Sequence, residues 1–268
     1  MYMKTTAYRR DDESWILTTT LVVLAAAGLI AAGPTLCIAP VLILIMIGMA
    51  YGMNQSAHAS LLRSAKQVTP QTSPPLYALV KDCQDRLDPG ALNVFVVPSR
   101  QLNAYTFGFS QPRAIVLYSS LLQVMDEDEL KFIIGHEMGH VALGHTWWNT
   151  LLGGMAGVPV GMGAAVLLSF AFRWWNRACE YSSDRAGLLA CGNPNKAITA
   201  LVKLVAREAD TPQEVAMVLQ ALDRQDDSLG NVLAETMASH PMLIKRINAI
   251  REYSQGTEFR NMLQQVNR

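Results

Sequence analysis

The stretch IIGHEMGHVALGH occupies residues 133–145 and contains the pattern His136-Glu137-x-x-His140. On a helix, positions four residues apart project from the same face, so the two imidazoles can bind one metal ion. Glu137 lies beside them, where it can reach a water on the metal without being a ligand. Zinc held in this way lowers the pKa of its water to about 7 and polarises a carbonyl group. The stretch therefore predicts a helix with a zinc site for hydrolysis, and Glu137 as the base.

The motif itself does not supply a third ligand. The pattern H-E-x-x-H-x-x-G-x-x-H requires a glycine and a histidine where this chain has Leu143 and Thr146, so that class of metalloprotease is excluded. His145 follows His140 by five residues, which turns it about 140° around the helix. We expect His145 at a helix end or in contact with a ligand, rather than on the metal.

Glu180, in the stretch CEYSSDRAG, is the stronger candidate for the third ligand. Asp184 follows one turn later and can accept the free N–H of a zinc-bound imidazole, which fixes the tautomer of that imidazole. The alternative is a solvated acidic pair flanked by Arg177 and Arg185. Because HEMGH lies upstream, we favour Glu180 as a ligand and Asp184 as the hydrogen-bond acceptor for a ligand imidazole.

Composition limits the class of protein. Half of the 268 residues are hydrophobic, 16% are charged and the formal net charge is zero, so nothing indicates a nucleic-acid partner. The apolar composition makes the lipid bilayer an expected partner, and the HEMGH motif, which is typical of metalloproteases, makes polypeptides the expected substrates. The cysteines form no C-x-x-C pair, and we interpret them as reduced thiols. They are Cys37, Cys83, Cys179 and Cys191.

Residues 15–53 carry no charged side chain. Two apolar arms of 18 residues flank Gly33-Pro34-Thr35. Each arm approaches the roughly 20 residues that cross a bilayer as a helix, and Gly-Pro breaks a helix. We therefore expect a transmembrane hairpin over 15–53, between an N-terminal segment, 1–14, and a linker, 54–73. A cleaved signal peptide is the alternative, but its apolar core has only about 7–15 residues.

Basic residues flank this hairpin on both sides and are absent from its turn. By the positive-inside rule both flanks lie in the cytoplasm. The rest of the chain is then expected to face the cytoplasm at a bacterial inner membrane. The flanking residues are Lys4, Arg9 and Arg10 before the hairpin, and Arg63 and Lys66 after it.

The pattern of the remaining residues, 74–268, predicts an α+β domain with a small sheet in its first part and helices after it. An amphipathic helix is expected over 76–87, and Asp126 with Glu129 resembles a capping box that opens the HEMGH helix. Helices with breaks, the first near Gly192-Asn193-Pro194, are expected over 176–265. The expected strands are 91–98, 102–109 and 113–119.

The stretches PRAIVLYSSLL, DEDELKFIIGHEMGHVALGH, EYSSDRAG and SHPMLIKRI together resemble the HtpX-type membrane zinc metallopeptidases. These are relatives of the type 1 CAAX prenyl protease and of the mitochondrial inner-membrane stress protease. The resemblance covers roughly 74–253. It implies a gluzincin-type fold with zinc on His136, His140 and Glu180, and Glu137 as the base.

The resemblance also implies further site residues. The strand at Asn103, Ala104 and Tyr105 would lie beside the zinc and receive an extended substrate at its edge. His240 and Arg246 match the family's H-P-x-x-x-x-R-I and would stabilise the oxyanion, or His240 would occupy the open metal position at rest. The alternatives are an ordinary edge strand, a helix cap at His240 and a surface ion pair at Arg246.

Residues 151–172 form a second uncharged run, shorter than the two spans that the family usually carries there. A single crossing would place His136 and Glu180 on opposite sides of the membrane. We therefore expect the run to leave and return on the same face, as a short hairpin or two tilted half-helices in the cytoplasmic leaflet. Its five glycines and Pro159 favour a break. Burial within the protein is the alternative. Tryptophans border the apolar runs: Trp15, Trp147, Trp148, Trp174 and Trp175.

These features predict a membrane-anchored zinc endopeptidase that acts on membrane or misfolded proteins. Prenyl-peptide processing and a non-catalytic adaptor with a structural zinc are the alternatives. A structural site is normally closed by four protein ligands, whereas this chain offers three and an intact Glu137, which favours the enzyme. An intramembrane protease is disfavoured because the motif helix begins with the charged stretch at 126–131.

Overall fold

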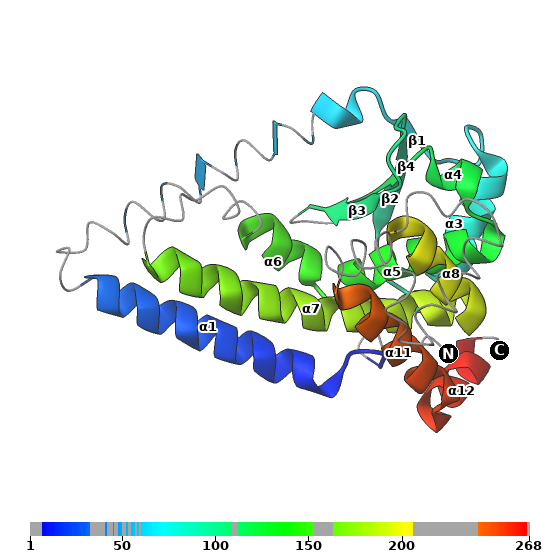
Figure 1. Ribbon diagram of the computed structural model, residues 1–268. Coiled ribbons are helices and arrows are strands. Elements are labelled where there is room, and N and C mark those ends of the chain that lie inside the picture. Colours follow the sequence, from blue (N-terminus) through cyan, green and yellow to red (C-terminus); the bar gives the residue numbers. More distant parts are fainter. Residues whose placement is uncertain are drawn as a thin grey trace, which may run out of the picture.

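The computed structural model describes residues 7–32, 60–108, 112–152, 163–205 and 241–266, together with isolated positions between 41 and 58. The described chain has the predicted α+β character: helices predominate, and one small sheet lies at the upper right of Figure 1.

The sheet contains four strands in the order β1-β2-β4-β3. β2 pairs with β4 in parallel, and the short outer strands β1 and β3 run antiparallel to their neighbours. The three predicted strands are confirmed with shorter ends. β1 is not predicted by the sequence because two residues are too few to show alternation, and it lies in the expected linker. The strands are β1 (Lys66–Gln67), β2 (Leu92–Val97), β3 (Ala104–Phe107) and β4 (Arg113–Tyr118).

Helix α3 (Pro74–Leu87) confirms the predicted amphipathic helix and begins with prolines, whose fixed φ suits a first turn. Its apolar side chains, including Val80 and Leu87, are buried in the main core. They pack beside α5 (Glu127–Ala142), the helix that carries HEMGH. The short helix α4 (Leu121–Val124) connects β4 to α5.

The start of α5 is fixed by the predicted capping box. The Asp126 carboxylate accepts the backbone N–H of Glu129 at 3.0 Å, and the Glu129 carboxylate accepts that of Asp126 at 2.9 Å. Two of the backbone donors that a helix start leaves free are thus satisfied. This cap fixes where the helix that carries His136 and His140 begins.

Glycines bring α5 against α7 (Gly163–Cys191). A Cβ atom added at Gly135 would lie 2.4 Å from the Cβ of Ala190, and one added at Gly139 would lie 2.8 Å from the Cβ of Ala186. Both distances are too short for real carbon atoms, so the two helices can approach this closely only without those side chains. The close packing places the histidine face of α5 beside the carboxylate face of α7.

Helix α7 is one continuous helix that includes both the second half of the apolar run 151–172 and Glu180. The sequence suggested separate elements, but no glycine or proline interrupts the chain between 164 and 186. The run begins with the last two residues of α6 (His145–Leu152), and residues 153–162 lie outside the described chain. The rings of Trp148 and Trp175 lie 6.5 Å apart between centroids, so the chain leaves and returns at neighbouring points.

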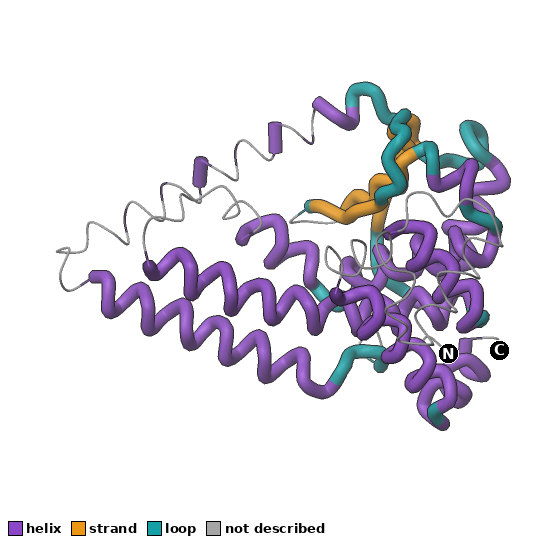
Figure 2. The backbone as a smooth tube through the Cα atoms, in the orientation of Figure 1, coloured by secondary structure: helices purple, strands orange, loops and turns teal. Residues whose placement is uncertain are grey.

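The C-terminal helices pack beside α7 and α5 at the right of Figure 1. They are α8 (Pro194–Val205), α11 (Pro241–Gln255) and α12 (Thr257–Val266). The predicted break at Gly192-Asn193-Pro194 is confirmed, with Gly192 at φ +68°, where glycine is favoured. Figure 2 shows these C-terminal helices grouped together, with the sheet above them.

The N-terminal segment packs onto the domain rather than forming a free tail. Tyr8 is fully buried in the main core. Helix α1 (Asp11–Ala32) follows and lies along α7 (Figure 1), with Ile16 packed on Trp175 and Ala178.

Helix α1 covers the first arm of the expected membrane hairpin. The turn Gly33-Pro34-Thr35 and most of the second arm lie outside the described residues. Among the helices as described, none combines the length and the hydropathy that a membrane crossing requires. The described cysteines, Cys83, Cys179 and Cys191, are free thiols.

Candidate active site

Three predicted ligands meet between α5 and α7. The Nε2 atoms of His136 and His140 lie 3.1 Å apart, and the Glu180 carboxylate oxygens lie 3.6 Å from the first and 3.4 Å from the second. All three ligand atoms lie within 4.8 Å of one another. The helical spacing of the histidines and the glycine contact between the helices produce this convergence.

The hydrogen bond behind His136 defines which of its nitrogens faces the other two residues. Nδ1 of His136 lies 3.0 Å from Oδ1 of Asp184, which is 2% exposed. A carboxylate oxygen only accepts, so the imidazole proton is on Nδ1. The lone pair on Nε2 is therefore directed at His140 and Glu180.

This donor set fits a divalent metal such as zinc. Lone pairs on nitrogen and a carboxylate that converge within 3.1–3.6 Å repel one another unless a cation lies between them. Tetrahedral zinc with metal–nitrogen bonds of about 2.0–2.1 Å separates its ligand atoms by roughly 3.3 Å. Three protein ligands with a hydrogen-bonded imidazole are typical of catalytic zinc sites.

Arg246, from α11, holds the two carboxylates of the site in place. Its Nη1 donates to Glu180 at 2.8 Å, while Nε and Nη2 donate to Asp184 at 2.7 and 2.5 Å. Burial alone would raise the pKa of Glu180, but the Arg246 charge and the two imidazoles outweigh it. The pKa of Glu180 is therefore well below its ordinary value, and the carboxylate is ionised.

Glu137 lies beside the ligand group and is 7% exposed. Burial, assisted by the negative charge of Glu180, raises the pKa of Glu137 to about 7, against the pull of His140 and Arg246. A carboxyl group with a pKa near neutrality can both accept and return a proton at physiological pH.

The site opens into a cavity of about 350 Å³. One wall is formed by Ala104 and Tyr105 of β3, the outer strand of the sheet, and by Asn103 just before it. The other wall contains Glu137, the three predicted ligands and Arg246. The structure thus brings the sequence-predicted residues into one place, except His240, which lies outside the described residues.

His145 stands at the start of α6 and contacts His140, as expected. Its Nδ1 lies 3.0 Å from Nδ1 of His140, and its Nε2 lies 3.0 Å from Oε1 of Glu13. Burial lowers the pKa of His145 to about 4, so its imidazole is neutral. The sequence gives no signal for Glu13, because 132 residues separate it from His145.

Known proteins resemble this chain over much of its length. The family model for peptidase family M48 matches residues 70–254. A plastoglobule-localized metallopeptidase 48 from Arabidopsis thaliana is 30% identical over 72% of this chain and 60% of its own length. Protease HtpX from Acinetobacter baumannii is 28% identical over 59% of this chain and 64% of its own length.

A protease HtpX homolog from Moorella thermoacetica is 24% identical over 73% of this chain and 77% of its own length. The chain thus spans less than two thirds of the length of the chloroplast and Acinetobacter relatives.

Proposed function

This chain belongs to peptidase family M48, a family of metallopeptidases, and on that premise we propose that it is a membrane-anchored zinc endopeptidase of membrane or misfolded proteins. The observation that carries the proposal is the convergence of His136, His140 and Glu180 beside a buried Glu137 in one cavity. The names of its HtpX relatives, which are proteases, agree with it.

The three ligand residues would hold zinc, and zinc would supply a polarised substrate carbonyl and an acidified water. Glu137 takes a proton from the attacking water and returns it to the leaving amine, which its pKa of about 7 permits. Asp184 keeps the proton of His136 on Nδ1, and Arg246 keeps Glu180 ionised. Arg246 uses three of its five N–H groups on these carboxylates, which leaves two for the oxyanion. His240 is proposed as the second oxyanion donor.

The substrate binds as an extended peptide along the outer edge of β3. An edge strand recognises a peptide through main-chain hydrogen bonds, so it tolerates varied side chains. Such loose specificity suits a protease of misfolded chains.

Two variants test the activity. Glu137→Gln should retain one zinc per chain and lose at least about 100-fold in the cleavage rate of an unfolded protein such as casein. Glu180→Ala should lose zinc and activity together. Glu127→Gln is the matched control, because Glu127 is an exposed residue of the same helix. Normal cleavage by Glu137→Gln would overturn the mechanism, and stoichiometric zinc without cleavage in the wild type would favour the adaptor.

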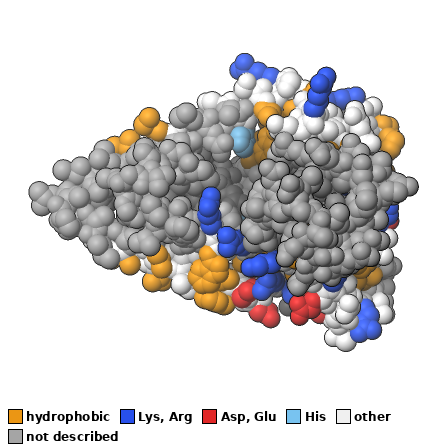
Figure 3. All heavy atoms as spheres, viewed as in Figure 1, with side chains coloured by type: hydrophobic (Ala, Val, Ile, Leu, Met, Phe, Trp, Pro, Cys, Tyr) orange, Lys and Arg blue, Asp and Glu red, His pale blue; other side chains and the backbone are white. Residues whose placement is uncertain are grey.

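The membrane part of the proposal is supported by the exposed apolar face of α1. Trp15, Val22 and Leu29 are 53%, 62% and 76% exposed on this helix. In Figure 3 the coloured side chains at the left end of the molecule are hydrophobic, whereas charged side chains lie at its centre and right, among further hydrophobic ones. Large apolar side chains exposed in this way along one helix fit contact with lipid tails better than contact with water.

We further propose that residues 151–172 enter and leave the membrane from one side. The neighbouring positions of Trp148 and Trp175 support this. Cysteine labelling tests this proposal. Trp147→Cys and Trp174→Cys are introduced singly into a variant without the native cysteines, and each protein is labelled in sealed vesicles. Both positions are more than a third exposed, so both should react with an impermeant reagent from the same side. Reaction from opposite sides would contradict the proposal.

A further inference from the structure

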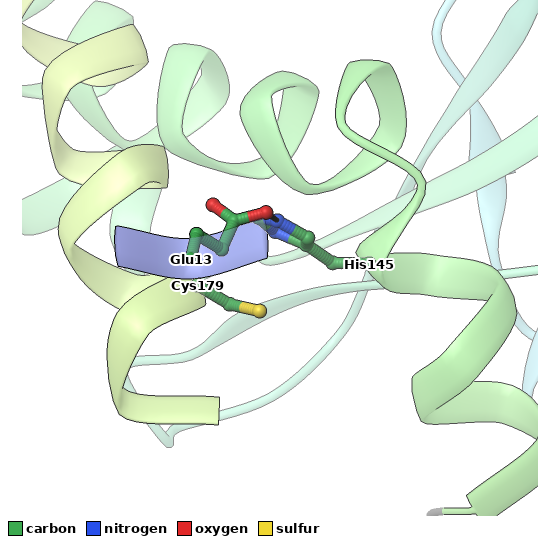
Figure 4. A group of neighbouring side chains, drawn as sticks. All are labelled: Glu13, His145 and Cys179. Carbon is green, nitrogen blue, oxygen red and sulfur yellow. Dashed lines mark hydrogen bonds and ion pairs between the residues drawn. The ribbon is translucent and has the colours of Figure 1, made fainter. Parts of the chain in front are cut away.

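A buried hydrogen bond connects the N-terminal segment to the ligand group. Figure 4 shows Glu13, at the start of α1, with its carboxylate directed at the imidazole of His145. Oε1 of Glu13 lies 3.0 Å from Nε2 of His145, and the two residues are 3% and 1% exposed. A charged group is buried this deeply only when it is paired.

The direction of this hydrogen bond follows from its partners. Burial works to raise the pKa of Glu13, but the hydrogen bond from His145 and the nearby Arg9 charge outweigh it, and the pKa falls below its ordinary value. An ionised carboxylate only accepts hydrogen bonds. His145 therefore carries its proton on Nε2, and its Nδ1 carries a lone pair.

That lone pair fixes the tautomer of His140. Nδ1 of His145 lies 3.0 Å from Nδ1 of His140, so one of these nitrogens must donate. Since His145 accepts, Nδ1 of His140 carries the proton. Nε2 of His140, 3.1 Å from Nε2 of His136, is left with the lone pair that a metal requires.

We propose that Glu13 is a positioning residue of the active site, which acts through His145 to present Nε2 of His140 to the metal. The inference rests on the proposed metal site and adds a residue that lies outside the region matched by the family model, 70–254. The same arrangement serves His136 through Asp184, so each ligand imidazole has a carboxylate behind it, one directly and one through a second imidazole.

Other contacts hold Glu13 in this place. Nε of Arg9 lies 3.4 Å from Oε1 of Glu13, and Nη2 of Arg9 donates to the carbonyl of Leu143 at 2.8 Å. The backbone N–H of Arg10 donates to Ser182 at 3.1 Å. The N-terminal segment is thereby attached to the end of α5 and to α7, and it brings the first apolar arm to the active site.

A second metal site is the competing explanation of the same cluster. Glu13, His145 and Cys179 place their ligand atoms within 4.8 Å of one another. A metal on Nε2 of His145 would, however, move the proton of His145 to Nδ1, where it would point at His140. His140 would then carry its proton on Nε2 and could not bind the first metal. The hydrogen bonds therefore favour positioning over a second site.

The test measures zinc affinity of the full-length protein by competition with a chromophoric chelator. Glu13→Gln should weaken zinc binding by about 10–100-fold. Asp12→Asn, the matched control, removes the adjacent carboxylate charge, which pairs with Arg10 at 2.6 Å, and should leave the affinity unchanged. In a His145→Asn background the new amide oxygen can accept from His140 without Glu13. There, Glu13→Gln should have no further effect.

A second measurement needs only the wild type. Nitrogen-15 NMR of the histidines in the zinc-loaded protein should show protons on Nδ1 of His140 and on Nε2 of His145. A proton on Nδ1 of His145, or two zinc ions per chain of which one is lost in Cys179→Ala, would overturn the inference. Wild-type zinc affinity in Glu13→Gln would also overturn the inference, but it would leave the proposed function intact. A wild type that binds no zinc would overturn both.

Discussion

Nδ1 of His136 lies 3.0 Å from Oδ1 of Asp184, and the same carboxylate accepts two hydrogen bonds from Arg246. Asp184 is thus fixed from one side while it fixes His136 from the other. Asp184→Asn should weaken zinc binding by about 10–100-fold, because an amide can also donate and no longer enforces the tautomer. Chelator competition measures this, with Asp85→Asn, on the outer face of α3, as the control. Unchanged zinc affinity in Asp184→Asn would show that Asp184 does not contribute to metal binding.

Arg246 is predicted to act on the reaction as well as on the carboxylates. Arg246→Lys should lower kcat by about 100-fold while zinc stays bound, because an ammonium group cannot bridge two carboxylates and still donate to an oxyanion. His240→Phe should also lower kcat without loss of zinc. Steady-state kinetics with metal analysis on the same samples measures both effects. If Arg246→Lys lost its zinc, the role of Arg246 would be to hold Glu180 in place and not to act on the reaction.

The start of α5 makes stability depend on pH. Burial works to raise the pKa of Asp126, but the hydrogen bonds from Lys196 and from the N–H of Glu129 outweigh it and lower the pKa. A lowered carboxyl pKa stabilises the fold above the unfolded-state pKa of about 4, and this stability is lost as pH falls through the folded-state pKa. Asp126→Asn keeps a cap but removes the charge.

The free-energy difference between wild type and Asp126→Asn should therefore be larger at pH 7 than at pH 3. Urea unfolding of the zinc-free protein at both pH values measures it. An equal difference at the two values would show that the Asp126 charge does not contribute.

The parts of the fold that the sequence predicts are those specified by neighbouring residues. The capping box at Asp126, the helix that carries His136 and His140, and the three longer strands each depend on patterns within a few residues. Glu180 is predicted as a ligand from Asp184 one turn later and from HEMGH upstream, and the family resemblance agrees. The structure traces the contact of Glu180 with the histidines to glycines on α5.

Other features could not be predicted because they depend on contacts between distant segments. Nothing near Glu13 in the sequence indicates that it meets His145. The pairing of β1 depends on β2, about 30 residues later, and two residues carry no periodic signal. The continuity of α7 was missed because its apolar and polar halves differ in composition, which suggests a boundary where the backbone has none.

Gly135 tests the close contact between α5 and α7. Gly135→Ala should destabilise the protein by about 1–3 kcal/mol, because the added Cβ would lie 2.4 Å from the Cβ of Ala190 and 3.1 Å from the Cα of Gly187. It should also weaken zinc binding, since the helices that carry the ligands are forced apart. The double variant Gly135→Ala with Ala190→Gly exchanges the two methyl groups and should recover part of both losses. Urea unfolding and chelator competition measure them, and no recovery would contradict the contact as the cause.

The edge of β3 gives the last prediction, because its register shows which amides face outward. The N–H of Tyr118 donates to the carbonyl of Asn103, and Ala104 lies opposite Leu117. Hydrogen-bonded pairs alternate along an antiparallel ladder, so Asn103 and Tyr105 bond to β4 while Ala104 presents its N–H to the free edge.

Ala104→Pro should therefore remove one hydrogen bond to substrate without breaking the sheet. Its KM for an extended peptide should rise by about 5–10-fold, the equivalent of one hydrogen bond of about 1–1.5 kcal/mol, at unchanged zinc content. Tyr105→Pro is the contrasting variant, because it removes the N–H that pairs with Val116 and should lower the free energy of unfolding instead. Normal cleavage by a folded Ala104→Pro variant would show that substrate does not add to this strand.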